Sequence, residues 1–149
     1  MLKQINEINK TIQSLLLLAD PSIEMINQYI KTGLVYKLEI ENKTIGVVVL
    51  KEMSHDNIEI MNIAVSEEHQ GKGYGKLMLK EAEVKSKELG YSHLKIATAN
   101  SSLNQLALYQ KCGFRMMAIE KDFFINEYKE VIMENGIRAM DKVILGKKI

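Results

Sequence analysis

The stretch Gln70-Gly71-Lys72-Gly73-Tyr74-Gly75-Lys76 follows an apolar run over residues 58–65 and precedes a helical pattern that reaches Leu89. Its glycines stand at every second position, and glycine permits tight turns and a close approach of the backbone to a ligand. A strand, a glycine-rich turn and a helix start together favour an anion site, because unpaired backbone N–H groups converge there. The stretch therefore predicts a site for a phosphate or pyrophosphate group.

Two common phosphate-binding motifs do not fit this stretch. The P-loop requires glycine, four residues and then Gly-Lys-Ser/Thr, but Leu77 follows Gly75-Lys76 and Gln70 stands where the first glycine should be. The dinucleotide fingerprint requires a third glycine where Lys76 stands, and an acidic residue at the end of the next strand. Residues 95–98 contain no acidic residue. The sequence excludes both motifs.

The pattern that remains is Gln-x-x-Gly-x-Gly, at Gln70, Gly73 and Gly75. A second block follows in the order Asn100, Ala107, Tyr109, Gly113 and Phe114. With these two blocks the chain resembles the GNAT superfamily of N-acetyltransferases over residues 34–114. The resemblance implies an α/β (mixed α+β) fold of the GNAT acyl-CoA N-acyltransferase type, with a central mixed, mostly antiparallel sheet and helices on both faces.

The periodicity of the chain agrees with a mixed sheet. We expect strands over residues 15–18, 34–41, 44–53, 58–65, 93–99, 114–120 and 138–145. We expect a first helix that begins at Asp20-Pro21 and stops at Gly33, and further helices over residues 75–89 and 103–112. Turns are expected at Asn42-Lys43 and Asn135-Gly136.

The resemblance implies that acetyl-CoA is the cosubstrate, with its pyrophosphate on the backbone N–H groups of residues 71–76 and its pantetheine amides on the strand end over residues 63–65. Many relatives have asparagine seven residues before the tyrosine, whereas here Asn100 and Asn104 stand nine and five residues before Tyr109, so either could face the pantetheine. The expected coenzyme-binding residues are Ile63, Ala64, Val65, Gln70, Gly71, Lys72, Gly73, Tyr74, Gly75, Lys76, Asn100 and Asn104.

Two residues are candidates for catalysis by the same resemblance. Tyr109 would protonate the departing thiolate, although an aromatic ring packed against the sheet explains a tyrosine there as well. Glu59 lies on a strand face that we expect it to share with Met61, Ile63 and Val65. A carboxylate among apolar neighbours has a raised pKa, which suits a general base. The alternative is a carboxylate that reaches water or a lysine.

Composition limits the function further. The chain of 149 residues, 46% hydrophobic and 26% charged, is expected to form a single domain over residues 1–149. A net charge of +1 argues against a nucleic-acid partner. One cysteine fits a reducing compartment, and the apolar run over residues 15–19 is too short to span a membrane, so we expect a cytoplasmic protein. The histidines have no metal-like spacing, and we expect no metal.

The expected function is an N-acetyltransferase that transfers the acetyl group directly in a ternary complex. The acceptor amine belongs to a small molecule, a peptide or a protein, and a homodimer is compatible with the sequence. Residues 121–136 are expected to shape the acceptor side, where aromatic and acidic residues could receive a cationic amine; a solvated helix packed by its aromatic residues explains the same composition. Two alternatives are an acyl-CoA-binding sensor without turnover and a structural domain without a ligand.

Overall fold

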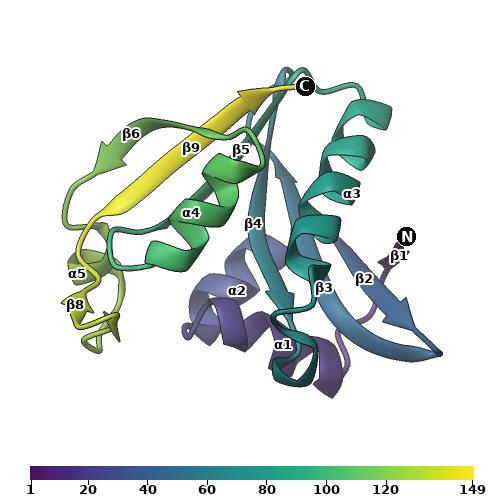
Figure 1. Ribbon diagram of the computed structural model, residues 1–149, viewed down its shortest axis with the longest axis horizontal. Helices are drawn as coiled ribbons and strands as arrows, with labels where there is room; N and C mark the ends of the chain where they lie inside the picture. Colours follow the sequence, from purple (N-terminus) through teal and green to yellow (C-terminus); the bar gives the residue numbers. More distant parts are fainter.

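A seven-stranded mixed sheet forms the centre of the computed structural model, which describes residues 1–149 (Figure 1). The strands β4 and β5 are parallel, and every other neighbouring pair is antiparallel. This sheet confirms the expected fold class. In spatial order the strands are β1 (Leu2–Ile5), β2 (Leu34–Ile40), β3 (Lys43–Glu52), β4 (Asn57–Val65), β5 (His93–Ala99), β9 (Lys142–Lys148) and β6 (Arg115–Glu120).

Helices cover both faces of the sheet, as expected (Figure 1). They are α1 (Lys10–Ala19), α2 (Ile23–Ile30), α3 (Tyr74–Glu88), α4 (Leu103–Lys111) and the short α5 (Phe123–Glu127), with a 3₁₀ turn over Glu67–His69. A small hairpin of β7 (Met133–Glu134) and β8 (Ile137–Arg138) precedes β9. Its turn at Asn135-Gly136 is the expected one, with φ of 56° and 74°.

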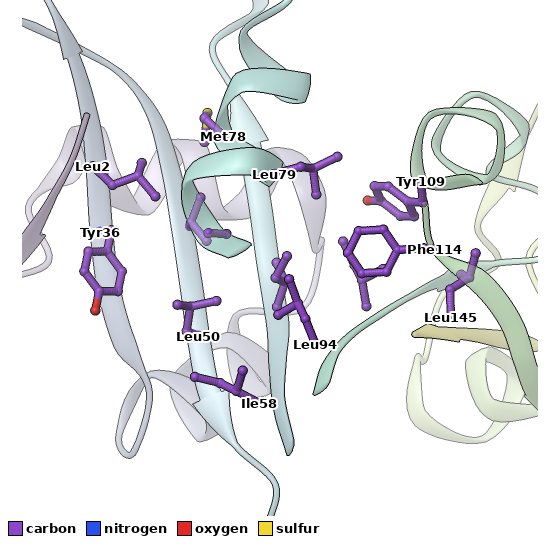
Figure 2. Close-up of a cluster of buried hydrophobic side chains, with 14 of the residues drawn as sticks. Leu2, Tyr36, Leu50, Ile58, Met78, Leu79, Leu94, Tyr109, Phe114 and Leu145 are labelled. Atoms are coloured by element: carbon purple, nitrogen blue, oxygen red, sulfur yellow. The ribbon is translucent and has the colours of Figure 1, made fainter. Parts of the chain in front are cut away.

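Two hydrophobic clusters fill the space between the sheet and its helices. Met78 and Leu79 of α3 and Tyr109 of α4 pack on one face, in the cluster that Figure 2 shows. Leu16 of α1 and Ile26 of α2 pack on the other face. The sheet therefore lies between two buried layers, and each layer places one pair of helices beside the end of β4.

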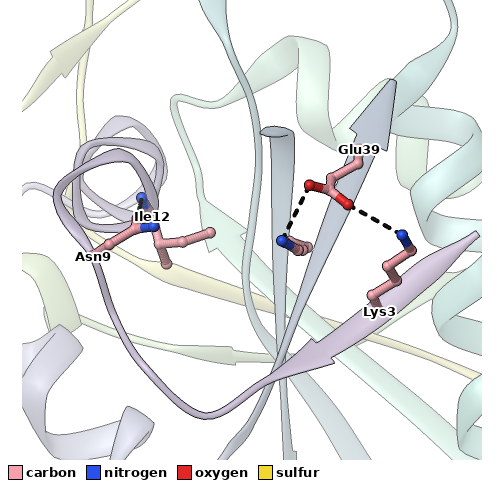
Figure 3. Close-up of polar contacts among 5 residues, drawn as sticks. Lys3, Asn9, Ile12 and Glu39 are labelled. Atoms are coloured by element: carbon pink, nitrogen blue, oxygen red, sulfur yellow. Dashed lines mark hydrogen bonds and ion pairs between the residues drawn. The ribbon is translucent and has the colours of Figure 1, made fainter. Parts of the chain in front are cut away.

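The expected strand over residues 15–18 is wrong, because these residues belong to α1. Ile12, Leu15 and Leu16 are buried, whereas Leu17 and Leu18 are 39% and 47% exposed, which is the spacing of one helix face. Because residues 15–18 are all leucine, the sequence does not show this helical spacing. The helix begins at Asn9, whose side chain accepts a hydrogen bond from the Ile12 N–H at 2.9 Å (Figure 3).

The N-terminal strand β1 was not expected from the sequence. It is short, and its partner β2 lies far along the chain. Glu39 of β2 accepts a hydrogen bond from Lys3 of β1 at 3.2 Å, which joins the two strands, and a second one from Lys37 of its own strand at 3.1 Å (Figure 3).

Three expected boundaries also change. Ser22, rather than Asp20, caps α2, because the Ser22 hydroxyl accepts a hydrogen bond from the Met25 N–H. The β2–β3 turn lies at Glu41-Asn42, where both residues have positive φ. The last strand begins at Lys142 rather than at Arg138, which pairs within the small hairpin instead.

Candidate active site

The two central strands separate where the site forms. Residues 57–60 of β4 pair with residues 93–96 of β5, and the pairing ends there. Figure 1 shows β4 and β5 diverging beyond this point. The edge of β4 over residues 61–65 therefore has no strand beside it on the β5 side, and its backbone N–H and C=O groups on that edge can bind an extended ligand.

A bulge in β4 sets which side chains face which layer. Asn62 pairs with Val49 and Ile60 pairs with Leu50, so Met61 has no partner on β3. After the bulge, Ile63 and Val65 pack on the face of α3, whereas Met61 packs on the face of α1 and α2. An extra residue changes the side of the sheet that later side chains occupy. The expectation that Glu59 shares a face with Ile63 and Val65 is therefore wrong; it shares one with Met61.

The glycine-rich stretch links the end of β4 to the start of α3. Gly71 and Gly73 have φ of 75° and 88°, a conformation that favours glycine. Gly73 precedes α3 and offers no side-chain cap, so N–H groups of the first turn are free to bind an anion. The Gln70 amide donates to the Val65 carbonyl at 3.0 Å, which holds the stretch against the strand end.

A groove runs along this stretch, between β4, α3 and α4. Nine of the twelve expected coenzyme-binding residues line it together with Tyr109. Those nine are Ile63, Ala64, Val65, Gln70, Gly71, Gly73, Tyr74, Gly75 and Lys76. Residues that the sequence did not indicate also line it, among them Leu18, Gln105 and Leu108. Gln105 stands one helical turn before Tyr109, so helical spacing from the tyrosine could have identified it.

Asn100 and Asn104 do not line the groove, and neither does Lys72, although it stands between Gly71 and Gly73, which do. The Asn100 side chain instead accepts hydrogen bonds from the N–H groups of Met140 and Asp141 at 2.8 and 3.0 Å. It thereby fixes the chain between β8 and β9. Asn104 is exposed on α4.

Tyr109 extends from α4 into the groove. Its side chain is 5% exposed, and in Figure 2 its hydroxyl points away from α4 toward Leu79 of α3. No protein group forms a hydrogen bond with this hydroxyl. Burial raises the pKa of the phenol, so it stays protonated at neutral pH. A protonated, unpaired hydroxyl is available to donate to a ligand atom in the groove.

Glu59 lies on the other side of β4, in a second cavity. It is 7% exposed, and its carboxyl forms neither a hydrogen bond nor an ion pair with the protein. Burial raises its pKa, and the charges of Lys142, Lys95 and Lys51 partly oppose that rise. A buried carboxyl with a raised pKa is suited to accept a proton near neutral pH.

A hollow between the diverging strands connects the groove to this cavity. Tyr109 and Ile63 line both the hollow and the groove, while Ile60 and Glu134 line both the hollow and the Glu59 cavity. Glu59 and Tyr109 therefore lie at opposite ends of a row of three adjoining cavities, which we call the passage. A reacting group bound in the hollow would have a proton acceptor on one side and a proton donor on the other.

The Glu59 cavity contains a hydrogen-bond network that the sequence did not indicate. The Asp20 carboxylate accepts from the hydroxyls of Tyr29 at 3.1 Å and Tyr128 at 2.8 Å, and from the Ser22 N–H at 3.1 Å. The Tyr29 hydroxyl in turn accepts from the Asn62 amide at 2.9 Å. Tyr128 belongs to the connection between β6 and β9 that was expected to shape the acceptor side, and it lines the cavity with Phe123 and Phe124.

No helix is both long enough and apolar enough to cross a membrane. No group of three or more His, Cys, Asp or Glu side chains is placed to hold a metal ion.

The sequence of the chain is similar to those of known acetyltransferases. The model of the family described as "Acetyltransferase (GNAT) family" matches residues 3–114. The chain is 46% identical over 139 residues to the uncharacterized N-acetyltransferase YvbK of Bacillus subtilis, a match that covers 93% of this chain and 90% of that protein.

Solved structures resemble the chain over its length. The IAA acetyltransferase from Bacillus cereus is 46% identical with a TM-score of 0.95, and the match covers 100% of this chain and 99% of that one. A GNAT family acetyltransferase from Elizabethkingia anophelis with acetyl-CoA bound is 42% identical with a TM-score of 0.96, and the match covers 100% and 97% of the two chains.

Proposed function

Since this chain belongs to the acetyltransferase (GNAT) family, we propose that it transfers the acetyl group of acetyl-CoA to a primary amine, directly and in a ternary complex. Acetyl-CoA would supply an activated thioester carbonyl. The observation that carries the proposal is the passage from the glycine-rich groove, past Tyr109, to Glu59. The groove and the Glu59 cavity would hold the two substrates at the same time, so the proposed reaction needs no acetylated enzyme.

The groove supplies groups for the coenzyme. Backbone N–H groups of residues 71–76, at the start of α3, would bind the pyrophosphate. The unpaired edge of β4 over residues 63–65 would bind the pantetheine amides as a neighbouring strand would. Gln105 and Leu108 would border the pantetheine arm from α4.

Glu59 and Tyr109 would move the two protons of the reaction. An alkyl ammonium ion cannot attack a carbonyl, so Glu59 would accept its proton, directly or through a water. The free amine would then attack the carbonyl carbon, and its nitrogen would lose a second proton as the amide bond forms and the carbon–sulfur bond breaks. The Tyr109 hydroxyl would donate its hydrogen to the departing sulfur, which leaves as the thiol of CoA, and the second proton from the nitrogen would restore the hydroxyl, directly or through a water.

The test is the release of CoA thiol from acetyl-CoA by the purified protein with a panel of primary amines. Amine-dependent thiol release, with the acetylated amine identified by mass spectrometry, is the expected result. Binding of CoA without turnover of any amine would instead support an acyl-CoA sensor. A covalent acetyl group on the protein in the absence of amine would contradict direct transfer.

A further inference from the structure

The Glu59 cavity has the chemistry of a cation site. The carboxyl groups of Asp20, Glu59 and Glu134 line it, and none of them forms an ion pair within the protein. The single ammonium group among the lining side chains, that of Lys142, lies 4.6 Å from the centre of the Phe123 ring. The cavity thus already places one cation against its aromatic wall, which is how aromatic side chains receive ammonium groups.

Glu59 gives an independent indication that a ligand group belongs in this cavity. Its side chain is more than nine-tenths buried, lines the cavity and has no hydrogen-bond partner. The carboxyl oxygens of Glu59 remain accessible from the cavity, so a ligand group bound there can donate to them. Proton transfer from the reacting amine fills this role, so Glu59 accounts for one cationic group only.

Asp20, unlike Glu59, is held by hydrogen bonds, and it indicates a second cationic group on the ligand. It is 9% exposed, and its carboxylate is held by two tyrosine hydroxyls and one backbone N–H. A carboxylate offers about four acceptor positions, so about one remains for a ligand. All its partners are neutral donors, so no cation of the protein pairs with this carboxylate.

The cavity is also small. Its volume is about 170 Å³, below the range of about 300–1,000 Å³ that is usual for drug-sized ligands. Such a volume suits a short aliphatic chain between aromatic side chains. Because both Glu59 and Asp20 line it, a linear molecule could present one end to each.

We infer that the acceptor is a small aliphatic amine that carries a second cationic group, and that Asp20, held by Tyr29 and Tyr128, is the specificity-determining residue that binds this second group. The inference rests on the proposed function, because it assigns the acceptor of the same site. The reacting amine loses its charge before it attacks, whereas the second group keeps its charge and needs a permanent anion.

The test compares three acceptors of equal chain length: diaminobutane, butylamine and aminobutanol. A hydrogen bond to a charged group predicts that kcat/KM for diaminobutane exceeds that for each of the other two by about tenfold or more. In Asp20→Asn the ratio of diaminobutane to butylamine should fall toward one. Asp56→Asn, which removes the same charge from an exposed turn, should keep the ratio. A retained ratio in Asp20→Asn would overturn the assignment of Asp20.

Further measurements cover three other outcomes: an unfolded Asp20→Asn variant, equal turnover of the three amines, and no turnover of any amine. If circular dichroism shows that Asp20→Asn does not fold, Tyr128→Phe takes its place, and an unchanged ratio there overturns the role of the network. Equal turnover of all three amines by the wild type would refute the second cation and leave the proposed function intact. If no amine releases CoA thiol, the proposed function fails; calorimetry on the CoA-loaded protein then decides the inference, because equal binding of diaminobutane and butylamine contradicts it.

Discussion

Tyr109 and Glu59 are both buried, both lack a hydrogen-bond partner in the protein and both border the passage, but only the tyrosine lines the groove along the glycine-rich stretch. Because the two residues lie in different parts of the passage, loss of the Tyr109 hydroxyl and loss of the Glu59 carboxyl should change the kinetics differently. A group that acts on the leaving sulfur matters mainly in the transition state, whereas a group that accepts the amine proton matters according to pH.

Tyr109→Phe should lower kcat by about 10²–10⁴-fold and leave the Kd for acetyl-CoA nearly unchanged. The hydroxyl has no bond to lose within the protein, so stability should also change little. Stopped assays of thiol release and calorimetry with acetyl-CoA measure the two effects. Tyr91→Phe is the matched control, because it removes a hydroxyl that bonds Glu52 at 2.7 Å, outside the groove. A kcat near that of the wild type would limit Tyr109 to packing.

Glu59→Gln should remove the rising limb of kcat/KM with pH. Burial raises the pKa of Glu59, so the limb should lie above the ordinary glutamate value of about 4.3, and the base is active only above that pKa. The acceptor must be a weakly basic amine that stays neutral across the range, since its own ionisation would otherwise give a similar limb. Glu88→Gln, an exposed charge at the end of α3, should keep the wild-type profile. Equal rates for wild type and Glu59→Gln at pH 7 would mean that another group or water deprotonates the amine.

At the level of the helices and strands, leucine substitutions can distinguish the helix α1 from the strand that we expected over residues 15–18. Leu16 is fully buried and Leu17 is 39% exposed, so the helix predicts that Leu16→Ala lowers the free energy of unfolding by about 2–5 kcal/mol and that Leu17→Ala changes it by about 0.5 kcal/mol or less. Urea denaturation measures both. In a strand, Leu15 and Leu17 would share one face, so similar losses for Leu15→Ala and Leu17→Ala would contradict the helix.

The elements that the sequence predicted are those with a local signal. Strands β2 and β3 are rich in apolar residues and flank a short turn, and α3 has a glycine at each end. The run Leu15-Leu16-Leu17-Leu18 is apolar at every position, so its hydrophobic pattern favours neither a helix nor a strand. The helix forms because it buries Leu15 and Leu16 in the second hydrophobic cluster. The two-sided apolar pattern of β4 predicted a central strand, but the bulge at Met61 depends on its pairing with β3.

In the candidate site too, residues close together in sequence were predicted, and contacts between distant residues were not. Nine of the residues predicted to bind the coenzyme line one groove, because they are contiguous along β4 and the glycine-rich stretch. The network at Asp20 was not, because Asp20 and Tyr128 stand 108 positions apart and meet only in the folded chain. Asn100 has the residue type that the family pattern suggests, yet its side chain is used to hold the chain before β9. Sequence spacing could not reveal that use.

The molecule as a unit consists of two parts of one sheet that share a short seam. Strands β1 to β4 form one part, β5, β9 and β6 form the other, and the parallel pairing of residues 57–60 with residues 93–96 joins them. The groove lies beyond the seam and takes residues from β4 and α3 on one side and from α4 on the other. A ligand in the groove therefore contacts both parts and should stabilise them together.

CoA at about 100 times its Kd should stabilise the folded protein by about 2.7 kcal/mol, which raises Tm by about 5–11 °C for a chain of this size. Scanning calorimetry should show a single transition that moves as one, because the ligand bridges both parts of the sheet. Gly73→Val should abolish the shift, since a valine at φ of 88° distorts the stretch that offers its N–H groups. Gly90→Val is the matched control: Gly90 has φ of 94° after the other end of α3, and an added Cβ meets no atom within 4 Å at either glycine. Both variants should lose similar stability through backbone strain, but only Gly90→Val should keep the CoA shift. A shift retained in folded Gly73→Val would place the coenzyme elsewhere.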